Sequence, residues 1–149
     1  MAYIVNKFAP GHSLYPTDAK QRALVDKQLY FDIGTLYKTE ADVLYPVLLH
    51  GAEKIDEEKD KVFRSKADLL EGFLANSKYV AGDNVTIADF AVYSSLTTLD
   101  LIDYDFSAYA NIVAWRKRLE AELPYVKEVS QDVIAEWKAI FAAARAGAK

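Results

Sequence analysis

The stretch that decides the fold reads Val80-Ala81-Gly82-Asp83-Asn84-Val85-Thr86-Ile87-Ala88-Asp89-Phe90. Residues 82–84 favour a turn, because glycine tolerates positive φ and the side chains of Asp and Asn bond to nearby backbone. Thr86 then stands at the position of a helix N-cap, and Asp89 follows three residues later, so that each side chain can bond to the other residue's amide. This capping box, with Asp in place of the more usual Glu or Gln, predicts a turn followed at once by a helix.

The predicted helix extends from Thr86 to about residue 102. No charged residue lies between Asp89 and Asp100, so the helix is apolar or neutral on every side. A helix of this kind belongs in the middle of a core. On the residues alone, Thr86 and Asp89 are interpreted as a structural capping box with no direct chemical role.

Further helices are predicted on both sides of this one, because apolar residues recur at spacings of three, four and seven and no segment alternates with the period of a strand. The expected helical ranges are 2–9, 18–50, 53–76 and 111–123. Pro124 should stop the fourth of these, and Ser130 should cap a last helix. The sequence therefore predicts an all-α fold of five to six helices around a buried central helix.

Two residues within the long predicted helix 18–50 carry expectations of their own. Pro46 should kink the helix near residues 41–45, because its ring clashes with the carbonyl four residues back. Gly34 lowers helix stability by about 1 kcal/mol relative to alanine, which favours a place where another element approaches closely. Two apolar faces also emerge on this helix, one of them through Tyr30, Ile33 and Tyr37. Both faces cannot meet the same core, so one is free to line a cleft or a partner.

Composition limits the class of protein. Apolar residues make up 52% and aromatic residues 13% of the 149 residues, and the formal net charge is -4. One domain with a substantial core is expected. Basic residues form no stripe interleaved with aromatics, so no nucleic-acid partner is expected. No apolar run reaches the roughly 20 residues of a membrane span. A cytoplasmic protein is the expectation, since the chain has no cysteine and so no disulfide.

Motifs for self-contained catalysis are missing from the sequence. His12 and His50 lie far apart and without nearby carboxylate or histidine partners at metal-binding spacing, so no metal site is expected. The glycines form neither of the usual phosphate-binding patterns, and no nucleophile elbow is present. We expect no catalytic residue within this chain.

Two separate segments carry a resemblance to a known family. Residues 82–89 resemble the start of the conserved central helix of glutathione S-transferase C-terminal domains, and residues 22–37 resemble the first long helix of that domain in the insect delta and epsilon classes. The likeness covers nearly the whole chain. It implies that residues 1–16 are the remnant of the last helix of a thioredoxin-like N-terminal domain plus the interdomain linker. Residues 17–149 would then be the helical C-terminal domain.

The resemblance also implies a binding site. In delta-like enzymes the pocket for a hydrophobic electrophile lies between the first long helix and the final helix, which points here to Tyr30, Ile33, Tyr37 and Phe141. On the residues alone, core aromatics are the favoured interpretation. Asp26 matches an acidic position that helps to hold the γ-glutamyl end of glutathione near the dimer interface, where a carboxylate faces an ammonium group. The alternative is an ordinary exposed aspartate.

The family's chemistry needs a residue that this sequence does not show. The hydroxyl that stabilises the glutathione thiolate belongs to the thioredoxin-like half, and the thiolate is the nucleophile. The resemblance thus implies a homodimeric detoxifying transferase with glutathione as cosubstrate, of which these 149 residues alone are expected to be inactive. The alternatives left open are a non-catalytic helical assembly module of the same fold and a generic ligand carrier.

Overall fold

A computed structural model describes the backbone of residues 1–147 and the side chains of residues 1–143. The predicted all-α fold is confirmed for these residues. The elements are α1 (Ala2–Phe8), α2 (Ala19–Phe31), the π-helical turn η1 (Asp32–Leu36), α3 (Tyr37–Leu49), α4 (Glu57–Ala75), α5 (Ile87–Thr98), the short 3-10 helix η2 (Leu99–Ile102), α6 (Ala110–Glu122) and α7 (Pro124–Gly147). None of the described helices is both long enough and apolar enough to cross a membrane.

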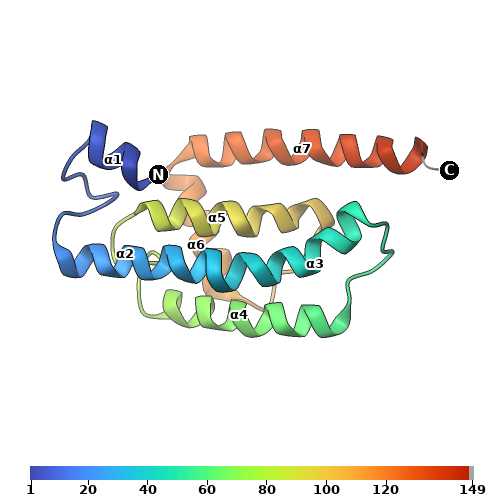
Figure 1. Ribbon diagram of the computed structural model, residues 1–149, viewed down its shortest axis with the longest axis horizontal. Helices are drawn as coiled ribbons and strands as arrows, with labels where there is room; N and C mark the ends of the chain where they lie inside the picture. The colour runs from blue at the N-terminus through green and yellow to red at the C-terminus, as the bar shows by residue number, and fades with distance from the viewer. Residues whose placement is uncertain (148–149) are drawn as a thin grey trace.

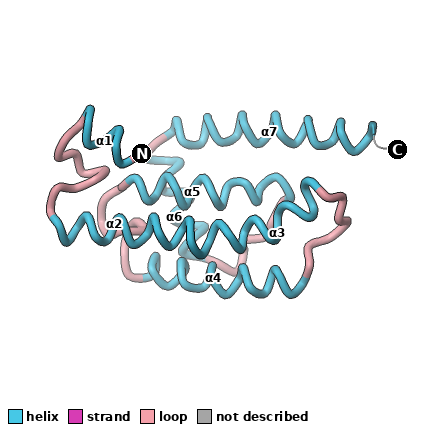
Figure 2. The backbone as a smooth tube through the Cα atoms, in the orientation of Figure 1, coloured by secondary structure: helices cyan, strands magenta, loops and turns pink. Residues whose placement is uncertain are grey.

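Most of the helices run along one axis (Figure 1). α2, η1 and α3 follow one another as a single rod, and α4 returns beside it in the opposite direction. α5 lies between this rod and α7, and α6 passes behind α5. The loops, drawn in pink in Figure 2, join the helices mainly at the two ends of the bundle. α5 is therefore the helix that the others surround.

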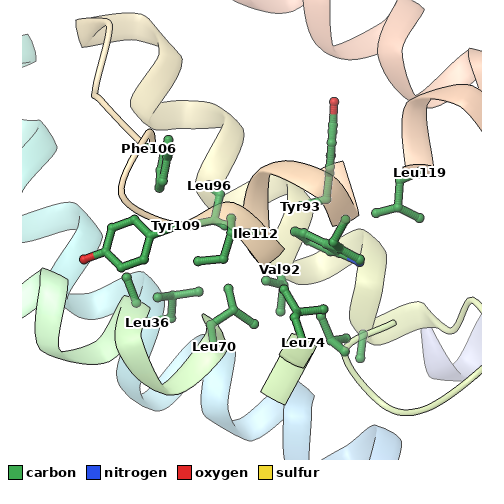
Figure 3. Packing of buried hydrophobic residues seen from close by; sticks show 14 of the residues in the cluster. Leu36, Leu70, Leu74, Val92, Tyr93, Leu96, Phe106, Tyr109, Ile112 and Leu119 are labelled. Carbon is green, nitrogen blue, oxygen red and sulfur yellow. The ribbon is translucent and has the colours of Figure 1, made fainter. Parts of the chain in front are cut away.

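The burial of α5 follows from its lack of charged side chains after Asp89. Eight of its side chains are buried, namely Ile87, Ala88, Asp89, Val92, Tyr93, Ser95, Leu96 and Thr97. Figure 3 shows Val92 and Leu96 among side chains from α4 and α6, including Leu70 and Ile112. Each large apolar side chain removed from water in this way stabilises the fold by about 1.5–3 kcal/mol. The predicted buried central helix is confirmed.

The long predicted helix 18–50 differs from expectation in one place. The π turn η1 divides it into α2 and α3, because the amide of Tyr37 donates to the carbonyl of Asp32, five residues back. Pro46 lies inside α3, and Figure 1 shows the C-terminal part of α3 turned away from the line of α2, as a proline kink predicts. Gly34 lies in the π turn, and a Cβ placed on it would meet no atom of the described residues within 4 Å. The prediction of a close approach at Gly34 is wrong.

The last helix begins at Pro124, not at Ser130. Proline suits the first position of a helix, where its missing N–H is not needed and its fixed φ is already helical. The residue that stops α6 therefore also starts α7. Ser130 lies inside α7, where its hydroxyl donates to the Val126 carbonyl at 2.7 Å, so the predicted cap at Ser130 is wrong.

Candidate functional site

Tyr30, Ile33 and Tyr37 lie on the outer side of the α2–η1–α3 rod. Their side chains are 75%, 66% and 39% exposed, although all three are large and mostly apolar. The hydroxyl groups of Tyr37 and Tyr45 lie 2.9 Å apart in a hydrogen bond. Three of the residues predicted for the electrophile pocket thus share one exposed surface, which we call the outer aromatic face (Tyr30, Ile33, Tyr37 and Tyr45).

The π turn lies in the middle of this face, between Tyr30 and Tyr37. A π turn inserts one residue into an α-helix, and such turns are frequent at functional sites. Here it keeps Leu36 fully buried while Ile33 and Gly34 point to the exposed side. No pattern in the sequence predicted this turn.

The inner side of the same rod carries polar residues that the sequence did not single out. Gln28, Asp32 and Glu40 are 2%, 8% and 1% exposed. Three of their side-chain oxygens are buried and have no hydrogen-bond partner within the described part of the chain, namely Gln28 Oε1, Asp32 Oδ1 and Glu40 Oε2. These residues follow the same helical spacing as the buried Val25 and Leu36, and that spacing is the signal that could have placed them inside.

Burial dominates the protonation of the two inner carboxyl groups. It raises the pKa of Glu40 from 4.5 to about 7, although the hydroxyl of Thr98 opposes the rise and the charge of Asp32 adds to it. Burial also raises the pKa of Asp32, and a hydrogen bond from Ser95 opposes that rise. In a low-dielectric surrounding the neutral form of a carboxyl group is favoured.

Asp26 lies at the other end of the rod, in α2, and is half-buried. Its Oδ1 accepts a hydrogen bond of 2.8 Å from the hydroxyl of Tyr15, and this bond is the main reason why the pKa of Tyr15 is raised. The guanidinium of Arg22 stacks on the Tyr15 ring at 4.4 Å and donates to the Pro16 carbonyl at 2.6 Å. Asp26 therefore helps to fasten residues 15–16 to α2, a structural role that the sequence did not predict.

Phe141 lies apart from the outer aromatic face. It is on α7, where its ring packs against Trp137 with the centroids 5.5 Å apart. A groove of about 340 Å³ separates α5 from α7, and its lining includes Phe90, Tyr125, Val129 and Val133. None of the four residues predicted for the electrophile pocket lines this groove. The described residues thus bring three of the four together and leave Phe141 separate.

The capping box predicted at Thr86 and Asp89 is present. Asp89 is fully buried, and its Oδ2 accepts from the Thr86 amide at 2.8 Å and from the Thr86 hydroxyl at 3.0 Å. Its Oδ1 accepts from the Val80 amide and from the indole of Trp115, both at 3.0 Å. Burial raises the pKa of Asp89, and these four donors oppose the rise. Trp115 itself is fully buried.

The two histidines, His12 and His50, lie far from one another along the chain. Nδ1 of His12 accepts from the Leu14 amide at 3.1 Å in the turn before α2, and His50 is exposed after α3. Within the described residues no group of three or more His, Asp or Glu side chains could hold a metal ion.

Comparison with known proteins gives one family. The family model described as "Glutathione S-transferase, C-terminal domain" matches residues 36–122, which is more than half of the chain. The match contains the capping box, the inner carboxyl Glu40 and all of α4, α5 and α6.

Solved structures agree with this match over nearly the whole chain. A delta-class glutathione transferase from Nilaparvata lugens is 38% identical with a TM-score of 0.86, and the alignment covers 95% of this chain and 66% of that one. A glutathione transferase from Bombyx mori is 35% identical with a TM-score of 0.83, covering 95% and 64%. An epsilon-class glutathione S-transferase from the housefly, Musca domestica, is 33% identical with a TM-score of 0.81, covering 95% and 66%. The chain thus spans slightly less than two thirds of the length of these relatives.

Proposed function

The chain belongs to the glutathione S-transferase C-terminal domain family, and we propose that it supplies the electrophile pocket and subunit contacts of a detoxifying glutathione transferase. The reaction would be the conjugation of glutathione to hydrophobic electrophiles. The observation that supports this most directly is the outer aromatic face. Its side chains stay exposed on a helix whose opposite side is buried against α4 and α5.

The chemistry of this face suits the proposed ligand class. Small-molecule sites are mostly apolar and aromatic with a few polar groups that fix orientation. Tyr30 and Ile33 offer apolar area, and Tyr37 adds a phenol that is already hydrogen-bonded to Tyr45. An apolar electrophile with one polar substituent could lie on the rings and bond to this pair of hydroxyl groups. Phe141 would join the pocket only by a change in the course of α7.

Asp26 is proposed to contribute to glutathione binding. Tyr15 engages one of its carboxylate oxygens, and the side chain is only half-buried, so an ammonium group can still approach it. Such a contact is charge-assisted. Asp26→Asn should weaken glutathione binding, whereas Tyr15→Phe should leave it unchanged. Equal effects of the two variants would assign Asp26 a purely structural role.

The proposal extends to domain organisation. We propose residues 1–16 as the last helix of a thioredoxin-like domain plus a linker, and residues 17–149 as the helical domain. In support, α1 has no buried residue, and its Tyr3, Ile4 and Phe8 are 67%, 59% and 73% exposed. Exposed apolar area of this kind is typical of surfaces that another domain or protomer covers. We also propose that the enzyme is a cytoplasmic homodimer. Sedimentation of the chain tests whether it associates with a second copy of itself.

Ligand binding to the 149-residue chain tests the proposed pocket. Calorimetry would measure the affinity of glutathione and of an S-alkyl glutathione conjugate, which presents both the peptide and an apolar group. We expect Tyr30→Ser and Ile33→Ser to weaken the binding of the conjugate several-fold more than the binding of glutathione itself. Val62→Ser is the matched control, since Val62 is apolar and 49% exposed but lies on α4.

The outcomes separate the proposals. Selective loss of conjugate binding in the two face variants supports an electrophile pocket. Equal loss in the Val62 control, or no effect of any variant, excludes this face as the pocket. Binding of neither ligand would mean that the site depends on the thioredoxin-like half. We expect no conjugation by these residues alone, because the thiolate-stabilising hydroxyl of the family belongs to the thioredoxin-like half.

A further inference from the structure

The inner side of the α2–η1–α3 rod holds an unusual contact with α5. The Thr98 hydroxyl lies in hydrogen-bonding contact with Glu40 Oε1 and also lies 2.6 Å from the carbonyl oxygen of Ser95. A hydroxyl group has a single proton to donate. The carbonyl of Ser95 and an ionised Glu40 are both acceptors only, so Thr98 cannot satisfy the two of them at once.

Protonation of Glu40 removes this conflict. A neutral Glu40 donates its own proton to Thr98, and Thr98 then donates to Ser95. Every contact in this chain of three groups is then a hydrogen bond with one donor and one acceptor. An ionised Glu40 instead takes the proton of Thr98, so the Ser95 carbonyl loses the hydrogen bond from this hydroxyl, and a bond of this kind contributes about 0.5–1.5 kcal/mol.

No positive charge among residues 1–143 is paired with Glu40. The four ion pairs among the described residues involve neither Glu40 nor Asp32. Glu40 Oε2 is buried with no hydrogen-bond partner among the described side chains, and Glu40 is 1% exposed. Burying a carboxylate without a paired charge is strongly unfavourable.

The other groups around Glu40 do not change this conclusion. On its own rod, Asp32 is a second buried acid and Tyr45 is a neutral phenol whose pKa Glu40 helps to raise. On η2, Asp100 is held in an ion pair with Arg116, with Nη1 3.2 Å from Oδ1.

From α4, the side chains turned inward are Phe63, Ala67, Leu70 and Leu74. These are apolar and supply neither a positive charge nor a donor. On the α5 side the Thr98 hydroxyl opposes the rise of the Glu40 pKa, but burial outweighs it, and the surroundings as a whole favour the neutral acid.

We propose that Glu40 is a proton-linked lock between α3 and α5: with its proton bound it packs between the two helices as a neutral group in hydrogen-bonding contact with Thr98, and loss of that proton as the pH rises leaves an uncompensated charge buried in their contact, which weakens it. The lock does not depend on the proposed transferase function. It places a conformational response near neutral pH in the rod that carries the outer aromatic face on its other side.

The sign of the pH dependence follows from linkage. The pKa of Glu40 rises from 4.5 to about 7 on folding, so the folded chain retains a proton that the unfolded chain has lost between these values. Stability therefore falls as the pH rises from about 4.5 to about 7 and is constant above that range.

Urea unfolding of the full chain at pH 5 and pH 8 tests the proposal. Between pH 5 and pH 8 the folding equilibrium constant of the wild type should decrease. This decrease should exceed that of Glu40→Gln by a factor on the order of a hundred. Glutamine keeps the size of the side chain and offers a neutral donor to Thr98, so this variant mimics the protonated acid. Asp42→Asn is the matched control, since Asp42 is exposed on the same helix; its pH dependence should equal that of the wild type.

Infrared spectroscopy provides a readout that does not rely on unfolding. A neutral buried carboxyl group gives a carbonyl stretching band. In the wild type this band should be present at pH 6 and should decline as the pH rises to 8. In Glu40→Gln the component of the band that declines should be absent. An unchanged difference in stability between pH 5 and pH 8 in Glu40→Gln would overturn the proposal. So would failure of Glu40→Gln to fold, because the mimic of the protonated state must be competent.

Discussion

Asp89 and Glu40 are two buried carboxyl groups at opposite ends of α5, and their surroundings differ. Asp89 belongs to the first turn of α5, whereas Glu40 belongs to α3 and contacts Thr98, the last residue of α5. At the N-terminal end, Asp89 receives four donors from three parts of the chain, the loop at Val80, the cap residue Thr86 and Trp115 of α6. At the C-terminal end, the described residues give Glu40 one hydrogen-bond partner, the shared hydroxyl of Thr98, and leave its Oε2 without any. A buried carboxylate is stable where donors surround it, and a buried acid takes up a proton where they do not.

The two ends therefore have different tasks. The Asp89 end fixes geometry, because a carboxylate that bonds to loop, cap and a distant helix permits only one arrangement of the three. The Glu40 end joins two helices through a contact whose strength depends on a proton. Both lie on the same central helix, so variants at the two ends can be compared within one fold.

The largest effect is expected at Asp89. Asp89→Asn replaces an acceptor oxygen by an NH₂ group that faces donors, so at least one buried amide or indole loses its partner. We expect the free energy of unfolding to fall by about 3 kcal/mol, measured by urea unfolding at pH 7. Asp83→Asn, at an exposed position of the preceding turn, should change it by less than about 0.5 kcal/mol. Similar changes in the free energy of unfolding for both variants would show that the hydrogen bonds of Asp89 contribute little to stability.

The next effect separates the two ends by pH. Glu40→Gln should be more stable than the wild type at pH 8 and nearly equal to it at pH 5, since glutamine does not ionise and the pKa of Glu40 is about 7 in the folded chain. Asp89→Asn should be less stable than the wild type at both values. If Glu40→Gln were less stable than the wild type at pH 8, both carboxyl groups would stabilise the fold in their ionised form. That result would contradict the difference proposed between the two ends of α5.

The Asp89 end was largely predictable from the sequence, because a capping box is a local pattern. Thr86 and Asp89 are three residues apart, and the absence of charged residues in the rest of the helix predicts that it is buried. The indole of Trp115 lies 26 residues away from Asp89, and no local rule brings it there. Pro124 shows the same limit at the other end of α6, since a proline can stop one helix and start the next, and only packing decides where the second begins.

The Glu40 end was not predicted at all. A charged residue in a helix is usually solvated, and nothing adjacent to Glu40 marks it as an exception. Its signal was its spacing from Leu36 and Val43 on the buried side of the rod. The outer face through Tyr30 and Ile33 was recognised as a second apolar side, but its interruption by a π turn was not, because that turn depends on how the rod fits α4 and α5.

A smaller effect should distinguish the two threonines that serve these carboxyl groups. Thr86→Ala removes a cap and should lower stability by about 1 kcal/mol. This loss should be similar at pH 5 and pH 8, because Asp89 retains its other donors. Thr98→Ala should have a similar effect at pH 5 but a larger one at pH 8, because the Thr98 hydroxyl opposes the raised pKa of Glu40. Urea unfolding of both variants at the two pH values measures the difference, and equal pH dependence would contradict the assigned roles.

The smallest effect is expected on the outer side of the rod, at Ile33. Its side chain is 66% exposed, so Ile33→Ser removes little buried area and should change the free energy of unfolding by less than about 0.5 kcal/mol. Thermal unfolding at pH 5 and pH 8 measures both this change and its pH dependence, which should match the wild type. A loss above about 1 kcal/mol would mean that the outer face is already covered in solution, for instance by a second copy of the chain. A changed pH dependence would mean that the proton on Glu40 is felt across the whole rod. In the absence of both, the inner side holds the protonation site while the outer side remains free to bind a ligand.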